Sequence, residues 1–309
     1  MPSLKSENQS SPASPNALKW AAPKAWLLAA RPKTWIASLS PVLIGTCMAA
    51  QNQPIRSSLF ILTLLFSLLI QIGTNFANDY FDFLKGADTS ERIGPKRAVQ
   101  QGWISPFSML IATLFTFAIA FFLAIPLMAL AGWWSLSIAI AAVLFGILYT
   151  GGPIPLGYLG LGEILVFVFF GPVAVCGSYF LQTASLNSAV FLSSLAPGLL
   201  SCSLLIANNL RDIETDRRAD KKTLAVRFGR TFGSWEYGAA LFGSAMTPIL
   251  LVLFYQAPWG VLVASLILPL SSPYLKRAFH FQNPLELIPV LQGSALLHLF
   301  YTISFCLLW

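Results

Sequence analysis

Long apolar stretches separated by short loops constrain the fold of this chain more than any other feature. A helix needs about 20 apolar residues to cross a bilayer, and it satisfies all of its backbone hydrogen bonds internally. Hydrophobic residue types make up 56% of the sequence and charged types only 10%, whereas a soluble domain carries about 25% charged residues. The sequence therefore predicts an all-α integral membrane protein.

About nine transmembrane helices are expected. The apolar segments bounded by loop signals cover approximately residues 34–50, 58–77, 106–129, 133–150, 161–181, 189–207, 234–255, 258–275 and 286–309. The division between the seventh and eighth segments rests on Gln256-Ala257-Pro258, because proline favours a turn there. Residues 1–24 are rich in Ser, Pro, Asn and Lys and are expected to form a disordered tail. Residues 25–309 are expected to form one transmembrane domain.

The basic residues indicate how the chain lies in the membrane. With the N-terminus in the cytoplasm, 18 of the 19 Lys and Arg residues fall in cytoplasmic segments, and Arg56 is the exception. Because this bias follows the positive-inside rule, we expect a multi-pass protein of the inner (cell) membrane with its C-terminus outside. The net charge of +7 then reflects contact with the lipid bilayer, and no nucleic-acid partner is expected.

Acidic residues gather in two short windows on this predicted cytoplasmic side. Eight of the twelve lie there: Asp79, Asp82, Asp88, Glu91, Asp212, Glu214, Asp216 and Asp220. The first window directly follows the second span, where a continued helix would place Asn78, Asp79 and Asp82 on one face. Gly86 and the Gly94-Pro95 pair predict a loop after this point.

The second acidic window directly follows the sixth span. Asp212, Asp216 and Asp220 recur every four residues, which predicts one helical face with Asn208 one turn earlier. Five basic residues surround this row: Arg211, Arg217, Arg218, Lys221 and Lys222.

Carboxylates one helical turn apart repel each other and therefore need a compensating cation. Mg²⁺ prefers oxygen ligands and takes one or two carboxylates together with substrate phosphates. Basic residues beside the acids suit a metal-bridged phosphate, because they bind the remaining phosphate oxygens. Solvated loops with ordinary ion pairs are the alternative. Two similar clusters, each beginning with Asn after an apolar span, favour Mg²⁺ and a diphosphate.

Two segments, Asn78-Asp79-x-x-Asp82 and Asp212-x-x-x-Asp216, resemble the Asp-rich signatures of the UbiA superfamily of intramembrane prenyltransferases. The resemblance covers nearly the whole chain from Arg31 onward. Further stretches look like the 1,4-dihydroxy-2-naphthoate prenyltransferases of menaquinone and phylloquinone synthesis: Arg31 to Thr34, Pro41 to Thr46, Arg92 to Arg97, Tyr149 to Pro153, Gly160 to Glu163 and Thr223 to Arg227.

The chain departs from the superfamily pattern at two places. The broader pattern has a third Asp where this chain has Gly86, and Asp88 is a candidate to replace it. The 4-hydroxybenzoate branch carries a Lys in the loop after the fourth span, whereas residues 151–160 contain no charged residue. This second departure argues against 4-hydroxybenzoate as the acceptor.

The resemblance implies a UbiA-type fold with helices around a central cavity, and Mg²⁺-dependent transfer of a polyprenyl or phytyl group from its diphosphate to 1,4-dihydroxy-2-naphthoate. The implied metal ligands are Asp79, Asp82, Asp88, Asp212 and Asp216. The residues implied to bind substrate are Asn78, Asn208, Asn209, Lys221 and Lys222. The basic residues implied to act in catalysis, by neutralising the departing diphosphate, are Arg92, Lys96, Arg97 and Arg211; Glu163 is a further catalytic candidate.

Glu163 is the only charged residue between Arg97 and Arg211, and an acid in a membrane span is a functional hypothesis by default. Two interpretations stay open for it: a base or charge stabiliser for the acceptor, or a brace for the loop at 157–162. Transfer to an isomeric dihydroxynaphthoate or to 4-hydroxybenzoate is an alternative activity, and a small-molecule transporter is an alternative class. Transporter sites lie near the bilayer midplane, whereas these acids lie at one face.

Overall fold

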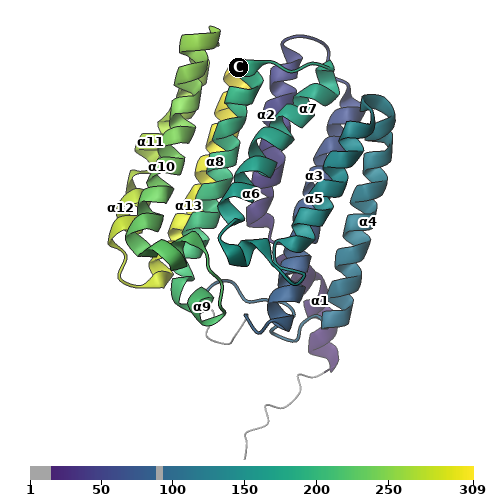
Figure 1. The fold of residues 1–309 in the computed structure, drawn as a ribbon, viewed down its shortest axis with the longest axis vertical. Helices are drawn as coiled ribbons and strands as arrows, with labels where there is room; N and C mark the ends of the chain where they lie inside the picture. Colours follow the sequence, from purple (N-terminus) through teal and green to yellow (C-terminus); the bar gives the residue numbers. More distant parts are fainter. Residues whose placement is uncertain (1–14, 88–92) are drawn as a thin grey trace, which may run out of the picture.

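The computed structural model describes residues 15–87 and 93–309, and all regular elements in these ranges are helical (Figure 1). The α-helices are α1 (Pro15–Ala30), α2 (Trp35–Ala50), α3 (Ser57–Leu84), α4 (Pro106–Ala131), α5 (Trp133–Leu148), α6 (Gly162–Val168), α7 (Ala174–Thr183), α8 (Ser188–Arg211), α9 (Ile213–Arg218), α10 (Leu224–Tyr255), α11 (Ile267–Leu270), α12 (Ser272–His280) and α13 (Leu287–Leu308). A π-helical turn, Phe169–Val173, joins α6 to α7, and a 3₁₀ segment, Trp259–Leu266, leads into α11.

The predicted membrane spans are present in the structure. Seven helical stretches of the described chain are long and apolar enough to cross a membrane. One shorter apolar helix, α5, has 16 residues, and with α2, which also has 16 residues, the structure is roughly consistent with the expected nine. The all-α membrane fold is therefore confirmed, and the turn predicted at Gln256-Ala257-Pro258 does separate α10 from the next span.

The N-terminal region differs from the sequence-based expectation. Helix α1 begins at Pro15, inside the segment 1–24 for which a disordered tail is expected. Its sequence is rich in Ala, Leu and Lys, which are strong helix formers, and α1 packs against α3. Residues 1–14 lie outside the described residues, and the division of the chain into a tail and one domain stays a prediction.

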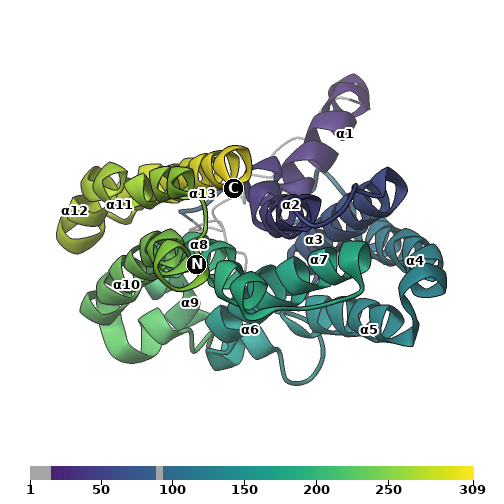
Figure 2. The ribbon, with the colours of Figure 1, turned by 90° about the horizontal axis from the view of Figure 1, so that it is seen from above.

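Helix α8 is the centre of the bundle. It packs against α2, α6, α7, α10 and α13, and 67% of its most apolar window is buried. Seen from above, α2 to α7 lie on one side of α8, and α10 to α13 lie on the other (Figure 2). The last helix returns to the first span, because α13 also packs against α2.

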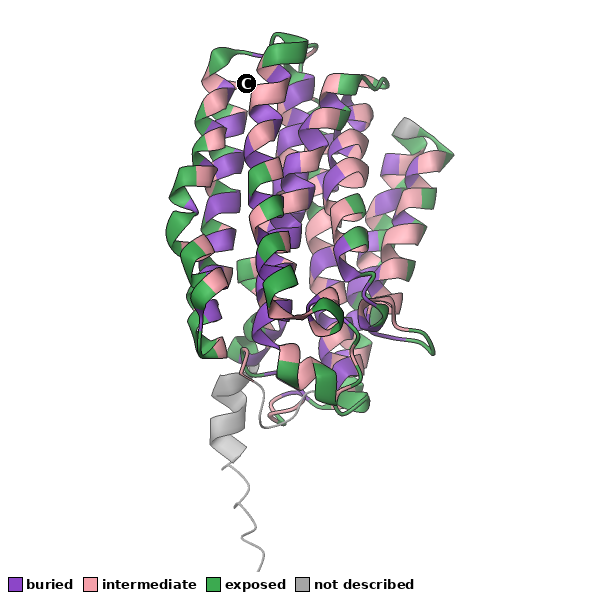
Figure 3. Ribbon diagram, turned by 60° about the vertical axis from the view of Figure 1, so that its left-hand side comes forward, coloured by how far each residue is buried: buried purple, intermediate pink, exposed green. Residues whose placement is uncertain are grey.

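The outer surface of the bundle carries large apolar side chains. Buried residues follow the inner helix faces, whereas exposed residues lie on the outer faces and at the ends (Figure 3). Phe107 is 71% exposed, Phe254 72% and Leu307 78%. Contiguous apolar surface of this kind is rare on soluble monomers, so it fits contact with lipid.

Close packing of α2 against α7 depends on Gly45. A Cβ atom at this position would collide with the carbonyl oxygen of Val175 and would lie 3.0 Å from the Cβ of Ser178. Gly177, on the same helix α7, offers a contrast, because a Cβ atom there would meet nothing within 4 Å.

These two glycines predict opposite effects for the same substitution. Gly45→Ala should lower the free energy of unfolding by about 1–3 kcal/mol, because added volume in a packed contact forces the backbones apart. Gly177→Ala should raise it by about 0.5–1 kcal/mol, because alanine favours the helix. Thermal unfolding in detergent, followed by circular dichroism, measures both. Equal stability of the two variants would contradict this account of the α2–α7 contact.

Candidate active site

The first acidic motif occupies the last two turns of α3. Asp79 and Asp82 share one helix face, as expected, and each is only 1% exposed. The helix stops immediately afterwards at Gly86, whose φ of +67° is left-handed. The N–H of Ala87 donates to the carbonyl oxygen of Asp82 (2.9 Å), and the N–H of Gly86 donates to that of Phe83 (3.0 Å). This is a Schellman motif, whose left-handed position favours glycine.

The second acidic motif ends in the same way. The N–H of Lys221 donates to the carbonyl oxygen of Asp216 (2.9 Å), and the N–H of Asp220 donates to that of Arg217 (3.3 Å). Asp220 has a left-handed φ of +54°, so the helix ends before it. The predicted row of three aspartates is therefore wrong for Asp220, whose side chain is 87% exposed and lies 3.7 Å from Lys222.

Lys221 joins the two motifs. Its Nζ lies 3.2 Å from Oδ1 of Asp82 and 4.0 Å from Oδ1 of Asp216. Arg97, from the loop after α3, places its Nη2 3.5 Å from Oδ2 of Asp82. Residues far apart in the sequence thus form one charged cluster at one end of the bundle.

A second group of charges lies at the end of α8. The guanidinium of Arg211 donates to both carboxylate oxygens of Asp212, at 2.7 and 2.6 Å, and to Oδ1 of Asn208 at 2.5 Å. Arg211 and Asp212 are 2% and 4% exposed. Bidentate pairs of this kind are strong and geometrically specific, so this aspartate has a fixed orientation.

Asp79 and Asn78 have different surroundings. Oδ2 of Asp79 accepts a hydrogen bond from the backbone N–H of Ala98 at 3.1 Å. Oδ1 is buried and has no hydrogen-bond partner among the described residues. Oδ1 of Asn78 accepts from the hydroxyl of Thr150 at 2.7 Å. The structure thus holds one buried carboxylate oxygen of the first motif without a hydrogen bond, which is costly unless a ligand binds it.

The loop between α5 and α6 supplies residues that the sequence did not single out. Tyr158 donates its hydroxyl to Oδ1 of Asp82 at 2.8 Å. Lys85, the last residue before Gly86, donates to the carbonyl oxygen of Thr150 at 2.6 Å. The Nζ atoms of Lys85 and Lys221 lie 4.8 and 4.7 Å from the centroid of the Tyr158 ring. Thr150 lies in one of the stretches that resemble the family, whereas no feature of the sequence marked Tyr158 as a site residue.

Partial burial lowers the pKa of Lys85. The neighbouring charge of Asp82 opposes this shift, and that of Lys221 adds to it. The ammonium of Lys85 therefore lies in a less favourable environment than a lysine in water, and a nearby anion would stabilise it.

Glu163 lies deeper, in the first turn of α6, and is 7% exposed. Its Oε1 accepts a hydrogen bond from the side-chain amide of Asn209 at 2.7 Å. Its Oε2 is buried without a hydrogen-bond partner among the described residues. The structure therefore links two predicted site residues directly to each other.

Other predicted residues stand apart from these groups. Lys96 is exposed, and no contact among the described residues joins its side chain to the cluster. Lys222 is 57% exposed and faces Asp220, although its backbone N–H donates to the carbonyl oxygen of Tyr158 at 2.8 Å. Asp88 and Arg92 lie outside the described residues.

A metal ion fits this site only if a bound phosphate provides part of its coordination. Within residues 15–87 and 93–309, no group of three or more His, Cys, Asp or Glu side chains converges closely enough to hold a metal ion. Mg²⁺ in phosphate-binding sites takes only one or two carboxylates and completes its shell with phosphate and water. The aspartates of both motifs, including the unpartnered Oδ1 of Asp79, fit such a shared ion.

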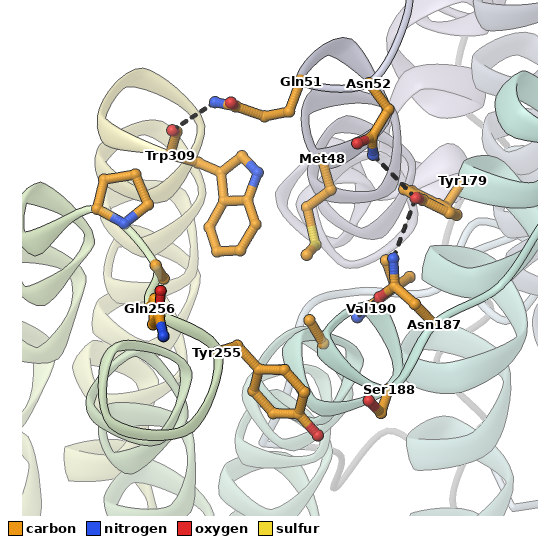
Figure 4. A pocket seen from close by; sticks show the side chains of 13 residues that line it. Met48, Gln51, Asn52, Tyr179, Asn187, Ser188, Val190, Tyr255, Gln256 and Trp309 are labelled. Carbon is orange, nitrogen blue, oxygen red and sulfur yellow. Dashed lines mark hydrogen bonds between the residues drawn. The ribbon is translucent and has the colours of Figure 1, made fainter.

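A pocket at the other end of the bundle has a different character (Figure 4). Its volume is about 380 Å³, and no charged side chain lines it. Asn52 and Asn187 donate to the hydroxyl of Tyr179 at 3.0 and 3.1 Å, while Gln51 donates to the carbonyl oxygen of Trp309 at 2.6 Å. Such a lining has no cation for a diphosphate, so this pocket does not compete with the charged end as the reaction site.

The fold and the charged cluster together define a class: helical membrane proteins with an acidic site at one membrane face. A model of the UbiA prenyltransferase family matches residues 38–300, and the chain belongs to this family. It is therefore an intramembrane prenyltransferase.

Curated relatives match over most of their length. The chain is 37% identical to a 1,4-dihydroxy-2-naphthoate octaprenyltransferase of Haemophilus influenzae, over 92% of this chain and 95% of the relative. It is also 37% identical to the Mycobacterium tuberculosis protein of the same name, over 90% and 94%.

Solved structures share the fold. A UbiA homologue from Archaeoglobus fulgidus bound to DMAPP and Mg²⁺ has a TM-score of 0.63 at 18% identity, covering 91% of this chain and 98% of the homologue. The apo structure of a UbiA homologue from Aeropyrum pernix K1 has a TM-score of 0.66 at 16% identity, covering 89% and 96%.

The charged site and the uncharged pocket should be reached from opposite sides of a membrane. Helix α8 has 24 residues and spans about 36 Å, more than the roughly 30 Å hydrocarbon core. Cysteine placed at Arg217, beside the site, and at Asn52, beside the pocket, should react with a membrane-impermeant maleimide from different sides of sealed vesicles. The parent chain, with its four native cysteines, is the control. Labelling of both positions from one side would contradict this arrangement.

Proposed function

We propose that this enzyme transfers a polyprenyl group from its diphosphate to 1,4-dihydroxy-2-naphthoate, in a reaction that requires Mg²⁺. The observation that carries the proposal is the meeting of Asp82 and Asp216 at Lys221, because it puts acids and bases from both motifs within reach of one diphosphate. The names of the curated relatives support the naphthoate acceptor. The Mg²⁺-bound homologue supports the metal.

The acidic and the basic residues of the site would have separate roles in binding the diphosphate. Asp79, Asp82, Asp212 and Asp216 are the proposed ligands of Mg²⁺, which supplies positive charge to the diphosphate when bound. Asp88 remains a further candidate for this role. Arg97, Arg211 and Lys221 are proposed to bind the remaining phosphate oxygens, and Arg92, Lys96 and Lys222 to add positive charge around them.

The ion pairs of the structure explain why metal and diphosphate should bind together. Breaking a buried ion pair by removing one partner is strongly unfavourable. A diphosphate alone would attract Arg97 and Lys221 and leave Asp82 without a positive partner. A cation alone would bind Asp82 and leave Arg97 and Lys221 without a negative partner. A metal–diphosphate complex gives each side chain a new partner of opposite charge.

The reaction breaks the bond between the diphosphate oxygen and the first carbon of the prenyl chain, and the electron pair leaves with the diphosphate. Positive charges at the leaving group stabilise this step, and such stabilisation is usually the largest catalytic contribution. A ring carbon of the acceptor then uses a π-electron pair to bond to the prenyl carbon, and it releases a proton, or its carboxylate as carbon dioxide, so that the bonding pair left behind restores aromaticity. The side chains of Asn78 and Asn208 hold Thr150 and Arg211 in place.

We also propose that the charged end of the bundle faces the cytoplasm in the inner membrane, with the pocket and the C-terminus outside. The distribution of Lys and Arg supports this orientation. In the labelling experiment above, a cysteine at position 217 would then react in inverted vesicles. Reaction in right-side-out vesicles would reverse the proposed orientation.

Loss of one aspartate charge should abolish most of the activity. Asp82→Asn and Asp216→Asn should each lower turnover by roughly a hundredfold or more, comparable to the loss of one electrostatic stabiliser. Glu214→Gln makes the same chemical change on helix α9, at a side chain that is 66% exposed and pairs only with Arg217 among the described residues, and should leave turnover unchanged.

The assay offers octaprenyl diphosphate, 1,4-dihydroxy-2-naphthoate and Mg²⁺ to the purified protein, and mass spectrometry detects the prenylated product. Gel filtration in detergent confirms that each variant is folded. Near-normal turnover in both aspartate variants would refute the proposed site, and an inactive parent chain would refute the proposed substrates.

Glu163 is proposed to act on the acceptor, as a base or as a stabiliser of positive charge. Glu163→Gln keeps an oxygen for the hydrogen bond from Asn209 but removes the charge. Turnover should therefore fall at least tenfold, while the KM for octaprenyl diphosphate stays the same. If Glu163 only braces the loop, the variant should instead keep the turnover of the parent chain and unfold at a slightly lower temperature, since a hydrogen bond contributes about 0.5–1.5 kcal/mol.

A further inference from the structure

The basic residues of the site differ in what neutralises them. Arg97, Arg211 and Lys221 each pair with an aspartate of the two motifs, at distances between 2.6 and 3.5 Å. Lys85 forms no ion pair with any residue in the described ranges. Its ammonium donates to the carbonyl oxygen of Thr150 and lies over the ring of Tyr158. These groups compensate part of a positive charge, but neither carries a full negative charge.

The position of Lys85 is fixed by the end of α3. It is the C-cap residue, and its N–H donates to the carbonyl oxygen of Phe81 at 3.0 Å. The left-handed turn at Gly86 follows at once. The backbone therefore presents this ammonium to the loop between α5 and α6, where residues 151–160 have no charge of their own.

A second cation lies close to the same aromatic ring. Lys221 and Lys85 approach the Tyr158 centroid to almost equal distances, but Lys221 is neutralised by Asp82. The charge of Asp82 also acts on Lys85, but the groups that contact this ammonium directly are uncharged, so an anionic group beside it would be its first direct partner of opposite charge among the described residues. The site is thus electrostatically prepared for one more anion, in addition to a diphosphate held by the paired cations.

We propose that Lys85 binds the carboxylate of the aromatic acceptor and thereby makes the enzyme selective for carboxylated rings. The inference rests on the proposed function, in which the acceptor carries one carboxylate and the donor one diphosphate. In the proposed function, the diphosphate is already bound by the acids of both motifs through Mg²⁺ and by the three cations that pair with those acids. The carboxylate would be bound by Lys85, whose ammonium donates to the loop at Thr150 and pairs with no acid of either motif in the described ranges.

Binding of a matched pair of ring compounds tests this role without turnover. The probes are 1-hydroxy-2-naphthoate and its neutral amide, titrated calorimetrically into purified protein with Mg²⁺ and inorganic diphosphate present. In Lys85→Gln the Kd for the naphthoate should rise about ten- to hundredfold, the range for losing a hydrogen bond to a charged group. The Kd for the amide should change less than about twofold. Lys85→Arg keeps the charge and should keep the preference for the naphthoate.

Lys276→Gln provides the matched control, because this exposed lysine on α12 undergoes the same chemical change at a distance from the site. It should bind both probes like the parent chain. In the octaprenyl transfer assay, Lys85→Gln should raise the KM for 1,4-dihydroxy-2-naphthoate and leave the KM for octaprenyl diphosphate unchanged.

Three results would overturn the inference. A parent chain that binds the naphthoate no better than the amide lacks the selectivity altogether. A rise in the KM for octaprenyl diphosphate alone would assign Lys85 to the donor. If Lys85→Gln lost affinity equally for both probes and had a lower melting temperature, Lys85 would be a structural support for the loop at Thr150. A parent chain that binds the naphthoate selectively but makes no product would refute the proposed function and leave the Lys85 assignment standing.

Discussion

The need to neutralise buried charge at the membrane face governs the active end of this protein. Asp82 and Arg211 are almost completely removed from solvent, where an unpaired charge would be very costly. Asp82 has its partners in the loop after α3, in the loop between α5 and α6 and just after α9, and Arg211 has its partners at the end of α8. The contact between Lys221 and Asp82 therefore also joins the two halves of the chain.

The endings of the helices place these charges. Both acidic motifs stop in a Schellman motif, and in each the second aspartate provides the carbonyl oxygen that closes it. In the first, Lys85 directly precedes the left-handed residue, and in the second Lys221 directly follows Asp220. Because each turn fixes the direction of the chain within one or two residues, both lysines are brought to the same aromatic ring. Helix termination thus contributes to the electrostatics of the site by placing the charged side chains.

The location of the charged end also suits the two kinds of substrate. A diphosphate reaches the site from water, whereas a prenyl chain is apolar and is stable among the helices. Helix α8 connects the two environments, since it leads into the second acidic motif at one end and lines the uncharged pocket at the other. The lipid-facing residues around the bundle are apolar and exposed, so the charged cluster is confined to one end.

The sequence by itself determined the membrane spans, the pairing of the two acidic motifs and the helix face shared by Asp79 and Asp82, because these depend on composition and on local helical spacing. It also indicated Gly86 as the end of a helix. Other features were decided by the tertiary structure. Asp220 left the expected helix face because its own backbone turned left-handed. Tyr158 and Thr150 joined the site through contacts with residues more than 60 positions away in the chain. Asn209 meets Glu163 across 46 positions of the chain. Such partners are set by how the helices pack, and the order of the amino acids in any one segment does not contain that information.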